Sequence, residues 1–432
     1  MFETLKNAWK IADLRKKILF TLLILLLFRI GSAIPVPFLN PAAIKELISG
    51  SGNLLGYLDV LTGGALGKAT IFAMSITPYI TSSIVIQLLT IAIPALERMA
   101  KEGEDGRKKI NKITRYTTVG LALIQAIAYY IMLRNTSGVV QYRSGFAGWF
   151  AAIVIVLAFT AGTALVVWLG EQINERGIGN GISIILFAGI LSRGPQMVSQ
   201  MMAYLELAKN GQTKYYFMVP LVIVIFLVVI AFIVLMTNAE RRIPVQYAKR
   251  VVGRKQYGGQ SSHIPIKVNM SGVMPIIFAS SLLAIPGTIK AFVDPSATSF
   301  WGKFLGAFDY NKPVYAILYF LLIIAFNYFY VAVQYNPIEI SNNIRKNNGT
   351  VPGLRPGKPT SDFIARIISK ITLIGALFLG LVAILPIVFG AVSGMNIALG
   401  GTTVLIIVGV AIDTMRQMES QMMMRHYKGF LE

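Results

Sequence analysis

Residues 219–236 read VPLVIVIFLVVIAFIVLM, eighteen positions without a charged side chain. A helix needs about 20 mostly apolar residues to cross the hydrocarbon core of a bilayer, and this stretch with its neighbours supplies them. The whole chain has the same character, because 55% of its 432 residues are hydrophobic and only 14% are charged. Soluble domains carry about 25% charged residues. The composition therefore indicates an all-α integral membrane protein.

Ten segments are apolar enough to be transmembrane helices. They lie at 18–36, 72–93, 113–133, 147–169, 181–201, 216–237, 270–289, 314–335, 367–389 and 398–414. Two are weak, because the fifth contains Arg193 and the tenth is short and reaches Asp413. The first follows Lys10 and Arg15 as a signal peptide would. Its apolar run is longer than a signal core, so we expect it to be retained as a span.

The loops between these segments predict the orientation, because Lys and Arg gather on the cytoplasmic side of membrane proteins. With both termini in the cytoplasm, 27 of the 40 Lys and Arg residues fall in the inner segments. The net charge of +21 is then mostly a matter of topology in a plasma membrane, and it does not predict binding of a specific nucleic acid sequence. The inner loops at about 238–268 and 336–366 are nevertheless longer than a helix connection requires.

The spans divide into five in residues 1–210 and five in residues 211–432. An odd number makes the second half enter the membrane from the opposite side, so two halves of similar fold would form an inverted repeat. Pro78 in the second span has a counterpart at Pro275 in the seventh. Each proline removes a backbone hydrogen bond and favours a local break. The pattern predicts two inverted five-helix halves.

Residue types that carry catalysis or metal binding are scarce. The chain has no cysteine, and its two histidines, His263 and His426, are far apart in sequence. Residues 63–69 read GGALGKA, but a phosphate-binding P-loop needs Gly where Thr62 stands and Ser or Thr where Ala69 stands. We therefore predict no catalytic residue, no metal site and no cofactor.

Ion-coupled transporters place charged groups at mid-membrane, where each costs about 2.5–3.5 kcal/mol on insertion scales. The predicted spans hold almost none, and Arg29 lies near the outer end of the first span, where its long side chain can reach the interface. A passive conduit driven by a partner fits best. A secondary transporter of a small solute is the main alternative, and a membrane-embedded enzyme ranks third.

Residues 54–67 read LLGYLDVLTGGALG, which is too short to span a bilayer and too apolar for a free outer loop. Two interpretations stay open. The segment is either an interfacial helix on the outer leaflet or a re-entrant segment buried in protein, where non-helical backbone is tolerated.

Seven stretches, spread along the chain, are similar to one known family. They are AMSITPYITSSIVIQLL (73–89), KEGEDGRKKINKITRY (101–116), WLGEQINERGIGNGISIILFAGI (168–190), QYAKRVVGRK (246–255), HIPIKVNMSGVMPIIFASS (263–281), NPIEISNNIRKNNGTVPGLRPG (336–357) and GGTTVLIIV (400–408). Together they resemble the SecY family, the channel subunits of Sec protein translocons. The sequence departs at Ser75, where the family usually has glycine. This is a change between two small residues.

The resemblance implies ten helices in two inverted halves that open like a clamshell around a ring of aliphatic side chains. Motif matches place this ring at Ile76, Ile80, Ile182, Leu186, Ile277 and Leu385. Such a ring keeps a narrow pore dry and blocks ions without binding a passing polypeptide. The family's plug falls on 54–67, and the matching residues are Leu55, Tyr57, Leu58, Val60, Leu61, Gly63, Gly64 and Leu66.

The resemblance also implies a lateral opening between spans 2–3 and spans 7–8. The uncharged polar residues expected there are Thr81, Ser82, Ser83, Gln87, Gln125 and Asn269. Interhelical hydrogen bonds in membranes are worth about 0.6 kcal/mol each, which is weak enough to open and close.

In the family the inner loops dock the ribosome and the SecA motor ATPase. The matching basic residues are Lys249, Arg250, Arg254, Lys255 and Arg355. Small membrane subunits of the SecE and SecG type, signal peptides, nascent polypeptides and membrane lipid are the other implied partners. The implied function is a bacterial-type channel that passes unfolded secretory polypeptides outward and releases transmembrane segments sideways.

Overall fold

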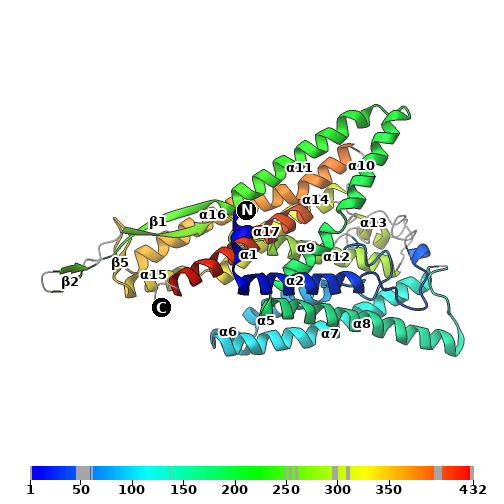
Figure 1. Cartoon of the computed structure of the whole chain (residues 1–432), viewed down its shortest axis with the longest axis horizontal. Coiled ribbons are helices and arrows are strands. Elements are labelled where there is room, and N and C mark those ends of the chain that lie inside the picture. Colours follow the sequence, from blue (N-terminus) through cyan, green and yellow to red (C-terminus); the bar gives the residue numbers. More distant parts are fainter. Residues whose placement is uncertain are drawn as a thin grey trace.

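The computed structural model describes residues 2–44, 59, 62–136, 138–247, 250–252, 255–257, 261–293, 300–307, 312–393 and 401–428. Helices dominate it (Figure 1). Up to residue 210 they are α1 (Phe2–Lys10), α2 (Ala12–Gly31), α5 (Thr77–Ala92), α6 (Pro94–Lys101), α7 (Glu104–Asn135), α8 (Gly145–Arg176), α9 (Gly181–Leu191) and α10 (Gly194–Lys209). Beyond it they are α11 (Lys214–Asn238), α12 (Met274–Val293), α13 (Phe300–Ala307), α14 (Pro313–Gln334), α15 (Pro337–Lys346), α16 (Lys358–Ser393) and α17 (Gly401–Lys428).

Each segment predicted to span the membrane overlaps one of these helices, and the fifth overlaps the pair α9 and α10. Among the described residues, six helical stretches are long and apolar enough to cross a bilayer. Helices α5 and α6 add a seventh if the 100° bend between them belongs to one span. Helix α2 has 20 residues but is basic at both ends. The fold is a helical membrane fold, and the count of ten spans stays a prediction.

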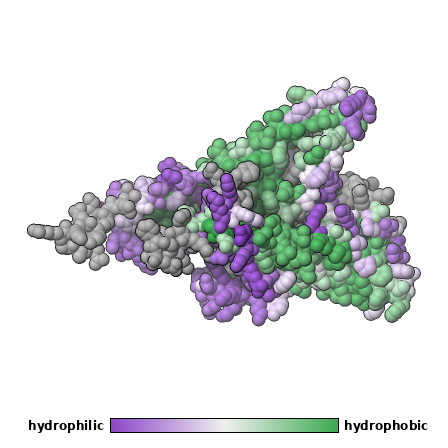
Figure 2. All heavy atoms as spheres, in the orientation of Figure 1, coloured by the Kyte–Doolittle hydropathy of each residue, from purple (hydrophilic) through white to green (hydrophobic). Residues whose placement is uncertain are grey.

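The surface of the helical body is apolar, unlike that of a water-soluble protein. Large side chains such as Leu26 of α2 and Leu235 of α11 are 58% and 68% exposed. Figure 2 shows hydrophobic residues over the helices, while hydrophilic residues gather at the end where α6 and α15 lie. A bilayer satisfies such a surface, because lipid takes the place of water around the outward side chains. The chain is therefore a multi-pass membrane protein.

The helices form two groups with separate cores. Helices α2, α5, α7 and α8 pack on one another, as do α11, α12, α14, α16 and α17. Figure 1 shows the first group along the lower side of the molecule and the second above it. Contacts between the groups run through α9 on α17, α10 on α11, and α12 against α5 and α7. The division near residue 210 and the inverted relation of the two halves both stay predictions.

The two long loops predicted to be cytoplasmic contain strands that the sequence analysis did not predict. Five strands are described: β1 (Glu240–Tyr247), β2 (Arg250–Val252), β3 (Lys255–Tyr257), β4 (Ser261–Lys267) and β5 (Gly349–Thr350). Strand β1 pairs antiparallel with both β4 and β5, and β2 pairs with β3. In Figure 1 this β2–β3 hairpin projects at one extremity of the molecule.

One face of this sheet is buried against helices. Ile243 and Val245 of β1 are 2% and 0% exposed, and they share a cluster with Ile344 of α15 and Ile364 of α16. Because β1 and β5 come from different loops, the sheet and its cluster join the two predicted loops into one packed unit.

The start of α9 lies very close to α8. Asn180 caps α9 by accepting the Ser183 N–H at 3.3 Å, and Asn174 of α8 accepts the Gly181 N–H at 2.7 Å. A β-carbon at Gly181 would collide with the carbonyl oxygen of Gly170, so only glycine fits. This approach fixes Ile182 and Leu186 beside α8.

Candidate functional site

Residue 59 and residues 62–76, which precede α5, are mostly buried within the helical body. The Ile71 N–H donates to the Ile34 carbonyl at 3.0 Å, and the Val36 N–H donates to that of Ala69 at 2.9 Å. Ala69 is 0% exposed. We call residue 59 with residues 62–75 the re-entrant segment. Burial in protein is what a re-entrant path requires, since an interfacial helix would keep one face towards lipid.

Only part of the predicted plug falls within this segment. Leu66 is buried, and Gly63 and Gly64 have φ angles of +69° and +84°, a region that favours glycine. A β-carbon at Gly63 would lie 2.8 Å from the Gly189 carbonyl oxygen of α9. The other predicted plug residues lie outside the described residues: Leu55, Tyr57, Leu58, Val60 and Leu61.

Asp59 organises the turn of the re-entrant segment. Its Oδ1 accepts the Gly67 N–H at 2.7 Å, and its carbonyl oxygen accepts the Gly64 N–H at 2.8 Å. Its Oδ2 accepts a hydrogen bond from Nη2 of Arg193, at the N-cap of α10, over 2.5 Å. Arg29 of α2 adds a weaker contact, from its Nη1 to the Gly63 carbonyl at 3.4 Å. Both arginines noted inside predicted spans therefore contact this segment.

Four of the six predicted ring residues share one hydrophobic cluster with part of the segment. They are Ile76, Ile80, Ile182 and Leu186. Ile76 is 0% exposed and Leu186 is 7% exposed. Phe72 of the re-entrant segment belongs to the same cluster and stacks on Phe28 of α2, with ring centroids 5.7 Å apart.

The remaining two ring positions lie in the second group of helices. Leu385 packs against the core of that group, and Ile277 of α12 is partly buried. Val410 of α17 bridges the groups by packing on the cluster that holds Ile76. The structure thus gathers the first-half positions, and a closed ring of six stays a prediction.

The predicted gate residues make mostly local contacts. Ser82 of α5 donates to the Thr114 carbonyl of α7 at 3.0 Å and also bonds to Thr117. Thr81 donates to the Thr77 carbonyl at 3.1 Å, and Gln87 donates to Ser83 at 3.3 Å. Gln125 is partly buried on α7. The Asn269 Oδ1 is buried with no hydrogen-bond partner among the described residues. The gate assignment stays a prediction.

Arg355 lies on a loop that is fixed at several points. The Leu354 N–H donates to the Val351 carbonyl at 3.1 Å, Thr360 donates to the Arg355 carbonyl at 2.8 Å, and Ser341 donates to the Gly357 carbonyl at 3.0 Å. The Arg355 side chain is exposed. Of the other predicted docking residues, Arg250 and Lys255 stand in β2 and β3, while Lys249 and Arg254 lie outside the described residues.

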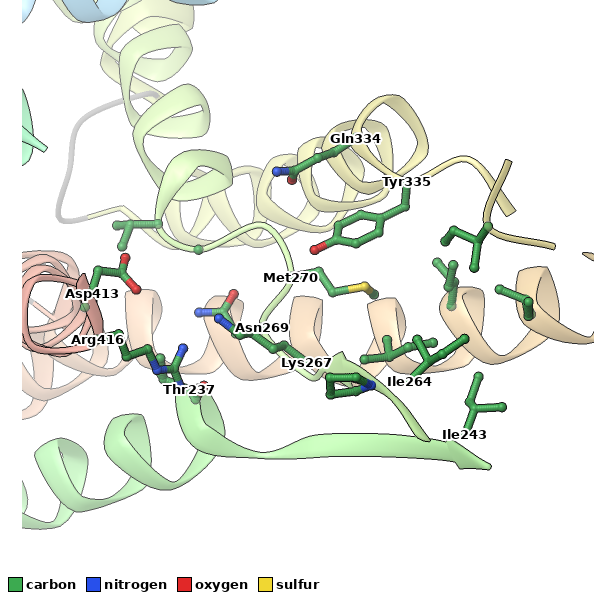
Figure 3. Close-up of a pocket in the computed structure, with 18 of the residues that line it drawn as sticks. Thr237, Ile243, Ile264, Lys267, Asn269, Met270, Gln334, Tyr335, Asp413 and Arg416 are labelled. Atoms are coloured by element: carbon green, nitrogen blue, oxygen red, sulfur yellow. Dashed lines mark hydrogen bonds between the residues drawn. The ribbon is translucent and has the colours of Figure 1, made fainter. Parts of the chain in front are cut away.

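A cavity of about 370 Å³ opens between β1, β4, the end of α14 and the first half of α17. Figure 3 shows Asn269, Met270 and Tyr335 pointing into it, with Asp413 and Arg416 of α17 at one side. Arg416 donates to the Thr237 carbonyl at 3.3 Å and to Asn238 Oδ1 at 2.8 Å. Sequence reasoning did not find this cavity.

A buried polar network beside α12 was also missed. Asn327 of α14 is 2% exposed, bonds through Oδ1 to the Ser271 hydroxyl, and donates from Nδ2 to the Thr372 carbonyl at 2.9 Å. An asparagine in the apolar stretch at 314–335 was the available signal, because polar groups in membrane helices are usually hydrogen-bonded.

Comparison with known proteins identifies the family. The SecY family model matches residues 70–415 of the chain. The protein translocase subunit SecY of Halalkalibacterium halodurans is 44% identical over 440 residues, and that of Mycobacterium tuberculosis strain H37Rv is 42% identical over 451 residues. Both alignments cover 100% of this chain and 100% of the relative.

Solved structures share the fold. One is a SecY channel whose plug domain is described as stabilising the closed state, with a TM-score of 0.64 and 18% identity over 94% of this chain and 92% of that chain. Another is Sec61 in the canine ribosome-channel complex, with a TM-score of 0.59 and 17% identity over the same shares. Family match, full-length relatives and fold agree, and this chain belongs to the SecY family of protein translocase subunits.

Proposed function

We propose that this chain is the passive pore of a bacterial-type Sec translocase, which moves unfolded secretory polypeptides outward and releases transmembrane segments sideways into lipid. As a SecY family member it is a protein-conducting channel subunit. The finer proposal is that the six aliphatic residues and the re-entrant segment together form the seal of the resting channel.

The proposal of a seal is supported by one observation: the re-entrant segment packs directly against the aliphatic cluster. Phe72 from the segment, Ile76 at the N-cap of α5, and Ile182 and Leu186 of α9 form one packed apolar group. A hydrated ion entering such a group loses water without gaining ligands, so a dry constriction opposes conduction. A translocating chain is tolerated because aliphatic side chains make no directional bonds with it.

We further propose that both termini and the β-sheet unit face the cytoplasm. The charge distribution supports this orientation, because the inner segments hold 27 of the 40 Lys and Arg residues. The β2–β3 hairpin and the Arg355 loop then project from the cytoplasmic end, where they would dock a SecA-type motor and the ribosome. SecE-type and SecG-type subunits would complete the complex.

Reconstitution tests this function. The purified complex in proteoliposomes, supplied with SecA, ATP and a secretory precursor, should protect the precursor from added protease. A matched preparation lacking this subunit gives the background. Protection equal to that background, with the complex intact and correctly inserted, would reject the proposal. Affinity purification from solubilised membranes should also recover SecE and SecA.

A further inference from the structure

The Asp59–Arg193 ion pair is buried far more deeply than the other ion pairs of the described residues. The side chains of Arg193 and Asp59 are 14% and 6% exposed. In each of the other pairs at least one side chain is 56% exposed or more. Exposed pairs contribute little because water and salt screen them. A buried pair behaves differently, because removing one partner leaves the other charge uncompensated in an apolar setting.

Asp59 and Arg193 each have few other hydrogen-bond partners among the described residues. Arg193 Nε is buried with no hydrogen-bond partner among the described residues, so Asp59 is the acceptor found for this guanidinium. Asp59 Oδ1 is already occupied by the Gly67 N–H, which leaves Oδ2 for the arginine. Movement of the re-entrant segment away from α10 would therefore strand a positive charge.

The pair also connects the two parts of the proposed seal. Arg193 follows directly on α9, which carries Ile182 and Leu186, while Asp59 begins the segment that carries Phe72. Gly63 also lies close to the end of α9, because a β-carbon added at this position would be 3.0 Å from Ser192 Oγ. A displacement of the segment must break this contact and the ion pair together.

We propose that Arg193 is a positioning residue for the seal, and that its ion pair with Asp59 holds the re-entrant segment against the α9–α10 junction in the resting channel. This inference rests on the proposed function for its effect on ion leakage, but not for its effect on the position of the segment. Re-forming the pair favours return of the segment after a polypeptide has passed, because Arg193 regains its acceptor.

Thiol labelling measures the position of the segment directly, because the chain has no cysteine of its own. Ala65 is 1% exposed within the segment, while Lys68 is exposed. Ala65→Cys is introduced into the complex in nanodiscs and treated with a membrane-impermeant maleimide. Lys68→Cys serves as the control for general reactivity. Asp59→Asn and Arg193→Gln are then added singly and together.

Each single substitution should increase the labelling rate of the cysteine at position 65 by about ten-fold or more, because an unpaired buried charge favours the displaced segment. The double substitution should increase it less than either single one, since it leaves no uncompensated charge. The rate at position 68 should stay within about two-fold in every background, because exposed sites need no opening.

Two results would overturn the proposal: unchanged labelling of the cysteine at position 65 in both single variants, or a double variant whose effect equals the product of the single effects. Resting conductance separates this failure from that of the proposed function. If Ile277→Asn leaks ions but Asp59→Asn does not, and position 65 stays protected, only the ion-pair inference fails. If neither variant leaks, the seal assignment fails and the labelling rates alone decide the role of the pair.

Discussion

Polar substitution of the proposed ring should make the resting channel leak ions. Ile277 and Leu385 are the informative positions, because both are only partly buried, so that an amide there is buried less completely than at Ile76. Ile76 is unsuitable because it is 0% exposed. An asparagine at Ile76 would bury an amide, which costs about 1–3 kcal/mol in proteins and would reduce the amount of folded subunit.

The size of the leak follows from the contact that the amide offers. One net hydrogen bond to a passing ion or its water is worth about 0.5–1.5 kcal/mol. A barrier lowered by that amount raises the rate about two- to ten-fold. Ile277→Asn and Leu385→Asn should each increase resting conductance by this factor. The double variant should show about the product of the single factors if the two positions act independently.

Single-channel recording in planar bilayers, with no precursor present, measures the effect. Val224→Asn is the matched control, because Val224 of α11 is 56% exposed on the apolar outer surface. All variants are compared at equal levels of inserted subunit. The two ring variants should leak and the Val224 variant should not. Equal conductance in the three would show that these two residues do not line the pore.

Three further outcomes are expected. Arg355→Glu should slow SecA-driven translocation several-fold at low salt and less at high salt, because it replaces an exposed attraction worth about 0.2–1 kcal/mol by a repulsion. Lys346→Glu changes the charge of the same loop equally and should have a smaller effect. Equal effects of the two substitutions would mean that Arg355 contributes only to membrane topology. Ser83→Cys should form a disulfide with a second cysteine introduced at one or more positions in residues 274–283 of α12, because α12 packs against α5. Disulfides need Cα atoms within about 7 Å. If no pair is ever cross-linked by oxidation, the predicted gate position is wrong. The purified subunit alone should release no phosphate from ATP, since the P-loop pattern fails at Thr62 and Ala69, and turnover that persists after SecA is removed would contradict a passive pore.

Hydrophobic length made the helices predictable, while the strands needed a second pattern. Residues 240–247 read ERRIPVQY, in which Ile243 and Val245 are buried and alternate with the exposed Arg242, Pro244 and Gln246. That period of two is typical of a half-buried strand. From the sequence, residues 238–268 were predicted only to form a long inner loop. The contact of β1 with β5 was beyond the sequence pattern, because it joins residues about a hundred positions apart and β5 has only two residues.

Ser75 shows where local backbone physics and family resemblance meet. Its φ angle is +46°, in the left-handed region that favours glycine, and its side chain is 2% exposed. The SecY family usually has glycine there, so the position requires a residue that can adopt a positive φ angle more than it requires a particular side chain. Sequence alone identified the departure, but the conformation that gives it meaning comes only from the structure.

The ring residues and the ion pair could be predicted from the sequence to different degrees. An isoleucine at position 76 is chemically the same as one facing lipid, and only the packing around it separates a constriction from a membrane surface. Asp59 and Arg193 were both visible as charges in apolar stretches, and charges in such surroundings are usually paired. Their partners could not be assigned, because 134 positions separate them and no periodicity connects them. Arg29, which is exposed near the end of α2, also contacts this segment through its guanidinium. Arg193, which weakened the fifth predicted span, and Arg29 therefore contact the same segment, and the contact with Asp59 explains why a charge lies in the fifth span.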